Sequence, residues 1–132
     1  LSLLPPITRR GLVLIDPPYE VKSDFQQVVN TVVLAHKKFS TGTYGIWYPV
    51  VDRVRIDQLE KNFVTSGIKN IQRFELAIAP DSHASGMTSS GMIVINPPWT
   101  LMEKMSRLLP KLVSKLTDDK GAFYKCDVLV SE

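Results

Sequence analysis

The stretch "GLVLIDPPYE", residues 11–20, joins a short apolar run to a pair of prolines and an aromatic residue. The continuous run at residues 11–15 is typical of a strand buried on both faces of a parallel sheet. Pro17 and Pro18 end that strand, because neither has an N–H for the hydrogen-bond ladder. We therefore expect Asp16 at the carboxyl end of a buried strand, the edge where open α/β sheets bind ligands.

Hydrophobic periodicity predicts further elements on the carboxyl side of this stretch. Apolar residues at helical spacing predict three helices. The first covers about 24–39, the second has Ile56, Leu59 and Phe63 on one face, and the third covers 101–116. A capping box of Ser23 and Gln26 is expected to begin the first helix. Continuous or alternating apolar residues predict strands over 44–51, 73–78, 91–96 and 124–130. The strands at 73–78 and 91–96 are expected to form an antiparallel hairpin. This order predicts an α/β layered sheet with a parallel portion and an antiparallel edge.

Composition indicates one globular domain and excludes several classes of protein. The chain has 132 residues, 44% hydrophobic and 22% charged, and no apolar run approaches the length of a membrane span. The single cysteine, Cys126, excludes an internal disulfide and a multi-cysteine zinc site. A formal charge of +3 permits nucleic-acid binding without requiring it. No signal peptide is recognisable, so a cytoplasmic location is expected, and the absence of an initial methionine suggests part of a longer protein.

The residues after the first strand suit an enzyme that alkylates an exocyclic amine of a nucleobase. Such an amine is a poor nucleophile because its lone pair is delocalised, and acceptors for its two N–H groups favour a geometry that can attack. Asp16 offers a carboxylate, and Pro17 offers a main-chain carbonyl held rigid by Pro18. The ring of Tyr19 suits stacking on a flipped base, worth about 1–3 kcal/mol.

This motif resembles the Asp/Asn/Ser-Pro-Pro-aromatic motif of S-adenosylmethionine-dependent amino-methyltransferases. Together with "GTYGIWYPVV", "ELAIAPDS", "GMTSSGMIVINPPW" and "LLPKLVSKL", it resembles the bacterial large-subunit (23S) ribosomal RNA adenine-N6 methyltransferase family. The likeness begins near residue 5 and covers the second half of that family's usual length. It implies a partial Rossmann-like methyltransferase sheet with parallel strands and a C-terminal antiparallel hairpin. Residues 1–132 would then form the C-terminal half, which carries the catalytic motif.

The resemblance also implies roles for the motif residues. Asp16 and the Pro17 carbonyl would hold the N6 amine of adenine, Tyr19 would stack on the base, and Asp16 would also touch the cofactor. The implied cofactor is S-adenosylmethionine and the implied partner is ribosomal RNA, with no metal and no membrane, and a monomer is expected. The family's glycine-rich cofactor loop falls before residue 1, and none of the seven glycines has G-x-G spacing. The isolated chain is therefore expected to bind cofactor poorly and to be inactive.

Two other functions fit the same residues. The chain could be a non-catalytic RNA-binding or structural remnant of the methyltransferase fold. It could also methylate another base or an amide, because relatives with Asn-Pro-Pro-aromatic modify guanine N2 or glutamine amides. Aspartate at the first position favours adenine.

A second, similar stretch, "GMIVINPPWT", occupies residues 91–100. Too few residues follow it to complete a methyltransferase sheet, so a structural role is predicted. Asn96 is expected near the end of the hairpin's second strand, with Trp99 packed under the last helix. The alternative places Trp99 on a rim that faces RNA.

Other residues could serve the same site. Trp47 and Tyr48 either wall a base pocket beside Asp16 or belong to the core. His83 lacks a partner at metal-ligand spacing, and its loop, "SHASGMTSSGM", either contacts phosphates or is a plain hairpin loop. Phosphate contacts are also possible for a basic cluster near the motif, formed by Arg9, Arg10, Lys22, Lys37 and Lys38.

Overall fold

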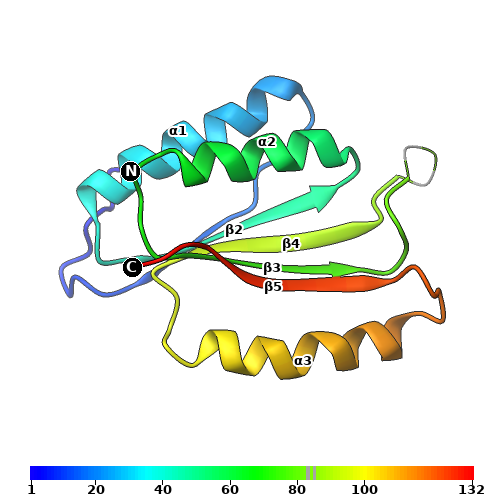
Figure 1. Ribbon diagram of the computed structural model, residues 1–132. Helices are drawn as coiled ribbons and strands as arrows, with labels where there is room; N and C mark the ends of the chain where they lie inside the picture. Colours follow the sequence, from blue (N-terminus) through cyan, green and yellow to red (C-terminus); the bar gives the residue numbers. More distant parts are fainter. Residues whose placement is uncertain (83, 85) are drawn as a thin grey trace.

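One mixed sheet with helices on both faces makes up the described part of the chain, residues 1–82, 84 and 86–132 of a computed structural model (Figure 1). The elements follow the predicted order, and the α/β prediction is confirmed. They are β1 (Leu12–Ile15), α1 (Lys22–Lys38), β2 (Thr43–Val50), α2 (Arg53–Val64), β3 (Ile71–Ala77), β4 (Ser89–Ile95), α3 (Leu101–Leu116) and β5 (Phe123–Val130). His83 of the connecting loop lies outside the described residues, so the prediction for it stays open.

The strand order is β1-β2-β4-β3-β5. The predicted hairpin is confirmed, because β3 pairs antiparallel with β4 from Ile71 opposite Ile95 to Ala77 opposite Ser89. Its place differs from the prediction of an antiparallel edge, since β4 also pairs antiparallel with β2 and lies in the middle of the sheet. Among the described strands only β1 and β2 are parallel, while β5 adds an antiparallel edge on β3. The antiparallel portion is therefore the larger one.

The two faces of the sheet are covered unequally. Figure 1 shows α1 and α2 together on one face and α3 on the other. The α1/α2 face carries the larger core, in which Tyr44, Ile46, Ile71, Ile93 and Ile95 are all fully buried. The α3 face carries a smaller cluster, built on Phe74, Val94 and Leu109. Because α3 packs on β3 and β5, the β1 end of its face is left open.

The prediction that the first strand is buried on both faces is wrong. Val13 and Ile15 pack against the α1/α2 core, but Leu12 and Leu14 are 68% and 66% exposed. The cause is the position of β1 at the sheet edge, beyond the reach of α3. A continuous apolar run shows that both faces of a strand are apolar, but it does not show whether another element covers each face.

The predicted capping box of Ser23 and Gln26 is also wrong. The first helix begins earlier, at Lys22, so Ser23 already lies inside it. The carboxylate of Asp24 reaches back instead and accepts hydrogen bonds from the backbone N–H groups of Glu20 (2.8 Å) and Val21 (2.9 Å). An acidic group in the first turn also complements the helix dipole.

A buried polar cluster ties α2 to the sheet. The fully buried hydroxyl of Tyr48 donates to Glu75 Oε1 (2.8 Å), and the Arg53 guanidinium binds both oxygens of the same carboxylate (2.8 Å each). Tyr48 reaches Glu75 by crossing over Gly91, where a β-carbon would come within 2.3 Å of the ring. Tyr48 is therefore a core residue, and its alternative role as a pocket wall is wrong.

No helix within the described ranges is long and apolar enough to cross a membrane.

Candidate active site at the carboxyl end of β1

Asp16 follows the last residue of β1 and lies on the open face of the sheet. The parallel pairing of Ile15 with Ile46 brings it level with Trp47 in the middle of β2. Asp16 is exposed, and within the described residues its carboxylate makes no hydrogen bond or ion pair. A cavity of about 250 Å³ lies against it, lined by Leu14, Asp16, Trp47 and Met92. The site thus offers one free carboxylate beside an apolar wall.

Gly45 forms part of the floor beneath this wall. A β-carbon added there would lie 3.4 Å from the sulfur of Met92 and 3.6 Å from Leu14. Because side chains alternate along a strand, Gly45 and Trp47 share the open face while Ile46 and Tyr48 face the core. Trp47 is therefore the member of the predicted aromatic pair that walls the pocket.

Tyr19 lies on the other side of the sheet edge, under α1. Its side chain is 9% exposed, its hydroxyl donates to the Trp47 carbonyl oxygen (2.6 Å), and its ring centroid is 4.8 Å from that of Phe25. Burial, reinforced by the negative charge of Asp16, raises the pKa of Tyr19 well above its ordinary value. The hydroxyl therefore stays protonated and fixes the backbone of β2 at the site.

The backbone of Tyr19 has a positive φ of 51°. An aromatic residue rarely adopts this left-handed conformation, and such strain concentrates at functional sites. Here the turn carries the chain from Asp16 on the open face, past Pro17 and Pro18, to α1 on the opposite face. The motif therefore wraps around the carboxyl edge of the sheet.

The second Asn-Pro-Pro-aromatic stretch lies at the opposite end of the strands, beside the start of β2. The side-chain amide of Asn96 donates to the carbonyl oxygens of Ser40 (2.8 Å) and Gly42 (2.9 Å), which joins β4 to the loop before β2. The structural role predicted for Asn96 is confirmed, since its side-chain nitrogen donates both of its hydrogen bonds to backbone carbonyl oxygens. The predicted packing of Trp99 under the last helix is wrong, because Trp99 is 92% exposed.

The basic cluster predicted from the sequence separates in space. Arg9 and Arg10 precede β1, and Lys37 and Lys38 end α1, so these four residues lie toward the edge away from Asp16. Lys38 is engaged with the Leu1 carbonyl oxygen (2.8 Å). Lys22, the first residue of α1, is the member that stays beside the motif.

Comparison with known proteins identifies the family. The family model described as "Ribosomal RNA large subunit methyltransferase D, RlmJ" matches residues 2–129. The chain belongs to this family. "Ribosomal RNA large subunit methyltransferase J" of Escherichia coli K12 is 54% identical over 113 residues, which cover 86% of this chain and 40% of that protein. The protein of the same name from Haemophilus influenzae is 53% identical over 118 residues, which cover 89% of this chain and 42% of that protein.

The family resemblance extends to a solved structure. Protein LPL1258 from Legionella pneumophila superposes with a TM-score of 0.87 at 34% identity, over 96% of this chain and 46% of that protein. The mixed sheet described above is thus part of a larger structure in that relative. The chain itself spans about two fifths of the length of the two relatives named methyltransferase J.

The sequence does not predict a place at the site for three residues that lie near the Asp-Pro-Pro-Tyr motif. Met92 helps to wall the pocket, Phe25 packs against Tyr19, and Arg55 lies 5.9 Å from the centroid of the Phe25 ring. Phe25 and Met92 carry ordinary core signals in their helix and strand. Only the pairing of β2 with β4, and the packing of α2 beside α1, brings these residues to the site.

Proposed function

We propose that the protein carrying this chain methylates adenine N6 in large-subunit ribosomal RNA with S-adenosylmethionine as methyl donor. The observation that carries the proposal is the free carboxylate of Asp16 at the carboxyl end of β1, beside the apolar wall of Trp47 and Met92. Membership of the ribosomal RNA methyltransferase family supports the substrate class. Ribosomal RNA also fits the expected cytoplasmic location.

The proposed chemistry is an in-line transfer to the exocyclic amine. The Asp16 carboxylate accepts one N–H of the N6 amine and the Pro17 carbonyl accepts the other, which directs the nitrogen lone pair out of the ring plane. S-adenosylmethionine, when bound, supplies a methyl group on a sulfonium sulfur. The N–C bond forms as the S–C bond breaks, and N6 loses a proton. Asp16 is the acceptor nearest to that proton.

Tyr19 is the proposed stacking residue. Its ring borders the hollow on the other side of the sheet edge and does not line the Asp16 cavity, so stacking on it requires the base to reach around that edge. Its ring is mostly buried and its hydroxyl is bound to the Trp47 carbonyl, so it also holds the strand that carries Trp47. Trp47 faces the Asp16 cavity directly and offers a second aromatic surface for the base.

The Asp16 cavity fits a flat apolar group better than a complete cofactor. Its volume of about 250 Å³ is below the usual range for small-molecule sites, about 300–1,000 Å³. Asp16 would touch the methyl-bearing end of S-adenosylmethionine, where amine and donor meet. We propose that the rest of the cofactor is held by residues outside this chain, which would be the C-terminal half of the methyltransferase domain.

Radiolabelled methyl transfer to unmodified ribosomal RNA tests the proposal, using the natural protein that carries this sequence. The Asp16→Ala variant should lose at least about a hundredfold in transfer, since it removes an acceptor that acts on the reacting amine. Its affinity for S-adenosylmethionine should stay within about tenfold. Asp16→Asn keeps a carbonyl acceptor and should retain part of the activity.

Asp57→Ala is the matched control, because Asp57 is an exposed carboxylate on the outer side of α2. It should transfer methyl groups like the unaltered protein. Unchanged turnover in Asp16→Ala would remove Asp16 from the reaction. Label on guanine or on protein would assign the chemistry to another amine, and no transfer by the unaltered protein would leave the non-catalytic alternative.

A further inference from the structure

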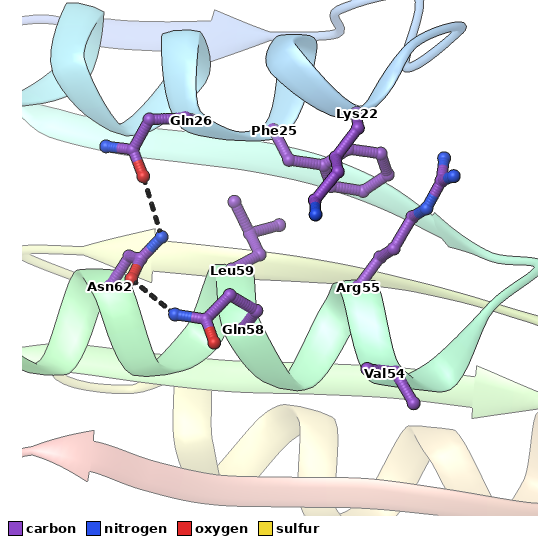
Figure 2. A pocket seen from close by; sticks show the side chains of 8 residues that line it. All are labelled: Lys22, Phe25, Gln26, Val54, Arg55, Gln58, Leu59 and Asn62. Atoms are coloured by element: carbon purple, nitrogen blue, oxygen red, sulfur yellow. Dashed lines mark hydrogen bonds between the residues drawn. The ribbon is translucent and has the colours of Figure 1, made fainter.

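A groove runs between α1 and α2, on the face of the sheet opposite the Asp16 cavity. It encloses about 260 Å³ between the first turn of α1 and the first three turns of α2, with the buried Leu59 among its lining residues. Figure 2 shows the ring of Phe25 between the side chains of Lys22, from α1, and Arg55, from α2. The remaining lining residues are Gln26, Val54, Gln58 and Asn62.

The two cations of this groove are not explained by helix stability. Lys22 is the first residue of α1 and Arg55 the third of α2, where positive charges oppose the helix dipoles. Arg53, in the same turn as Arg55, is bound to Glu75 and Asp81. Among the described residues, Arg55 makes an exposed contact with Asp52, at 3.7 Å, and lies 5.9 Å from the centroid of the Phe25 ring. Lys22 and Arg55 are thus placed to hold an anion.

Carboxamide groups form a row along the other end of the groove. Gln58 donates to Asn62 (2.9 Å), and Asn62 donates to Gln26 (3.0 Å), so the row joins the two helices (Figure 2). Carboxamides present donors and acceptors together, which is the chemistry that reads the edges of unpaired bases. The described residues that line this groove include no carboxylate.

The groove is continuous with the motif. Phe25 and Arg55 also line a neighbouring hollow of about 320 Å³, whose wall includes Tyr19. The Tyr19 and Phe25 rings are 4.8 Å apart between centroids. This hollow is also lined by the acidic residues Glu20 and Asp52, and it joins the groove to Tyr19 at the end of the motif.

We infer that this groove binds a nucleotide of the RNA substrate on the opposite side of the sheet edge from the target adenine. Lys22 and Arg55 hold its phosphate, and the carboxamides of Gln26, Gln58 and Asn62 face its base or ribose. The volume suits one unit of a polymer and not a complete free ligand. The inference rests on the proposed function, since it takes the RNA of that reaction as the ligand.

Neutralising either cation tests the groove in the natural protein that carries this sequence. Arg55→Gln and Lys22→Gln should each raise the KM for unmodified ribosomal RNA about tenfold, with kcat within about twofold. In anisotropy measurements with a single-stranded RNA, each variant should lower the slope of log K against log salt by about 0.7. Lys61→Gln, an exposed cation on α2 outside the groove, should change neither quantity.

Equal KM values and salt slopes for the three variants would overturn the inference. Loss of folding in Arg55→Gln, seen by circular dichroism, leaves the test to Lys22→Gln, because removing a cation from the first turn of α1 favours the helix. An acidic peptide provides a second test. If it binds the unaltered protein but not Arg55→Gln or Lys22→Gln, while both variants still bind RNA like the unaltered protein, the groove binds a protein segment and the inference is wrong. The salt slope needs no methyl transfer, so its outcome is separate from failure of the Asp16 test.

Discussion

Replacing Gly91 by alanine should destabilise the protein far more than the same change at Gly45. A β-carbon at Gly91 would lie 2.3 Å from Cζ and 2.4 Å from the hydroxyl oxygen of Tyr48, which is fully buried and cannot move outward. Overpacking of this kind costs about 1–3 kcal/mol. Displacing the ring also breaks the hydrogen bond from Tyr48 to Glu75 Oε1 (2.8 Å), a bond to a charged group worth about 1.5–3 kcal/mol.

The expected loss is therefore roughly 2.5–6 kcal/mol, a large share of the ~5–15 kcal/mol that stabilises a domain. Urea unfolding followed by circular dichroism measures this loss in the natural protein that carries the sequence. Gly45→Ala is the matched control, because its β-carbon would meet nothing closer than 3.4 Å. It should cost less than about 1 kcal/mol. If the two variants unfold within about 0.5 kcal/mol of each other, Tyr48 does not cross over Gly91 and the account of the α2 cluster is wrong.

Two further predictions concern the edge away from Asp16. Asn96→Asp should cost about 2–4 kcal/mol in urea unfolding, because a carboxylate would face the carbonyl oxygens of Ser40 and Gly42 in place of a donor. A cost near zero would show that the amide does not hold this loop. Burial lowers the pKa of His36 below its ordinary value of 6.5, so the unfolded chain binds the proton more tightly than the folded one. Stability from this group is present above that value and is lost as the pH falls below it. His36→Gln should reduce the loss of stability between about pH 7.5 and pH 5.5, and equal losses in both proteins would contradict the shift.

The sequence predicts the elements because each is encoded by its own local pattern. Continuous or alternating apolar residues predict the strands, helical spacing predicts the helices, and the prolines after Ile15 place Asp16 at a strand end. Strand order is not local. The position of β4 between β2 and β3 depends on pairing between residues that are distant in sequence, such as Ile46 with Ile93.

At the site, the burial of a side chain is harder to predict from the sequence than the element that carries it. Alternation shows that Trp47 and Tyr48 face opposite sides of a strand, but which side meets the core depends on where α1 and α2 pack. Trp99 looks like a core residue by type and is 92% exposed, because the chain turns into α3 before its side chain meets the sheet. The choice of Asp24 over Ser23 as the cap depends on a shift of only a couple of residues in the start of α1.

The exposed leucines of β1 link solubility to the site. Leu14 is both an uncovered apolar side chain at a sheet edge and a wall of the Asp16 cavity. An uncovered edge strand of this kind invites association with other chains. A segment or partner that shields Leu14 from water would also cover one wall of the pocket beside Asp16, so protection against aggregation and access to that pocket depend on the same contact.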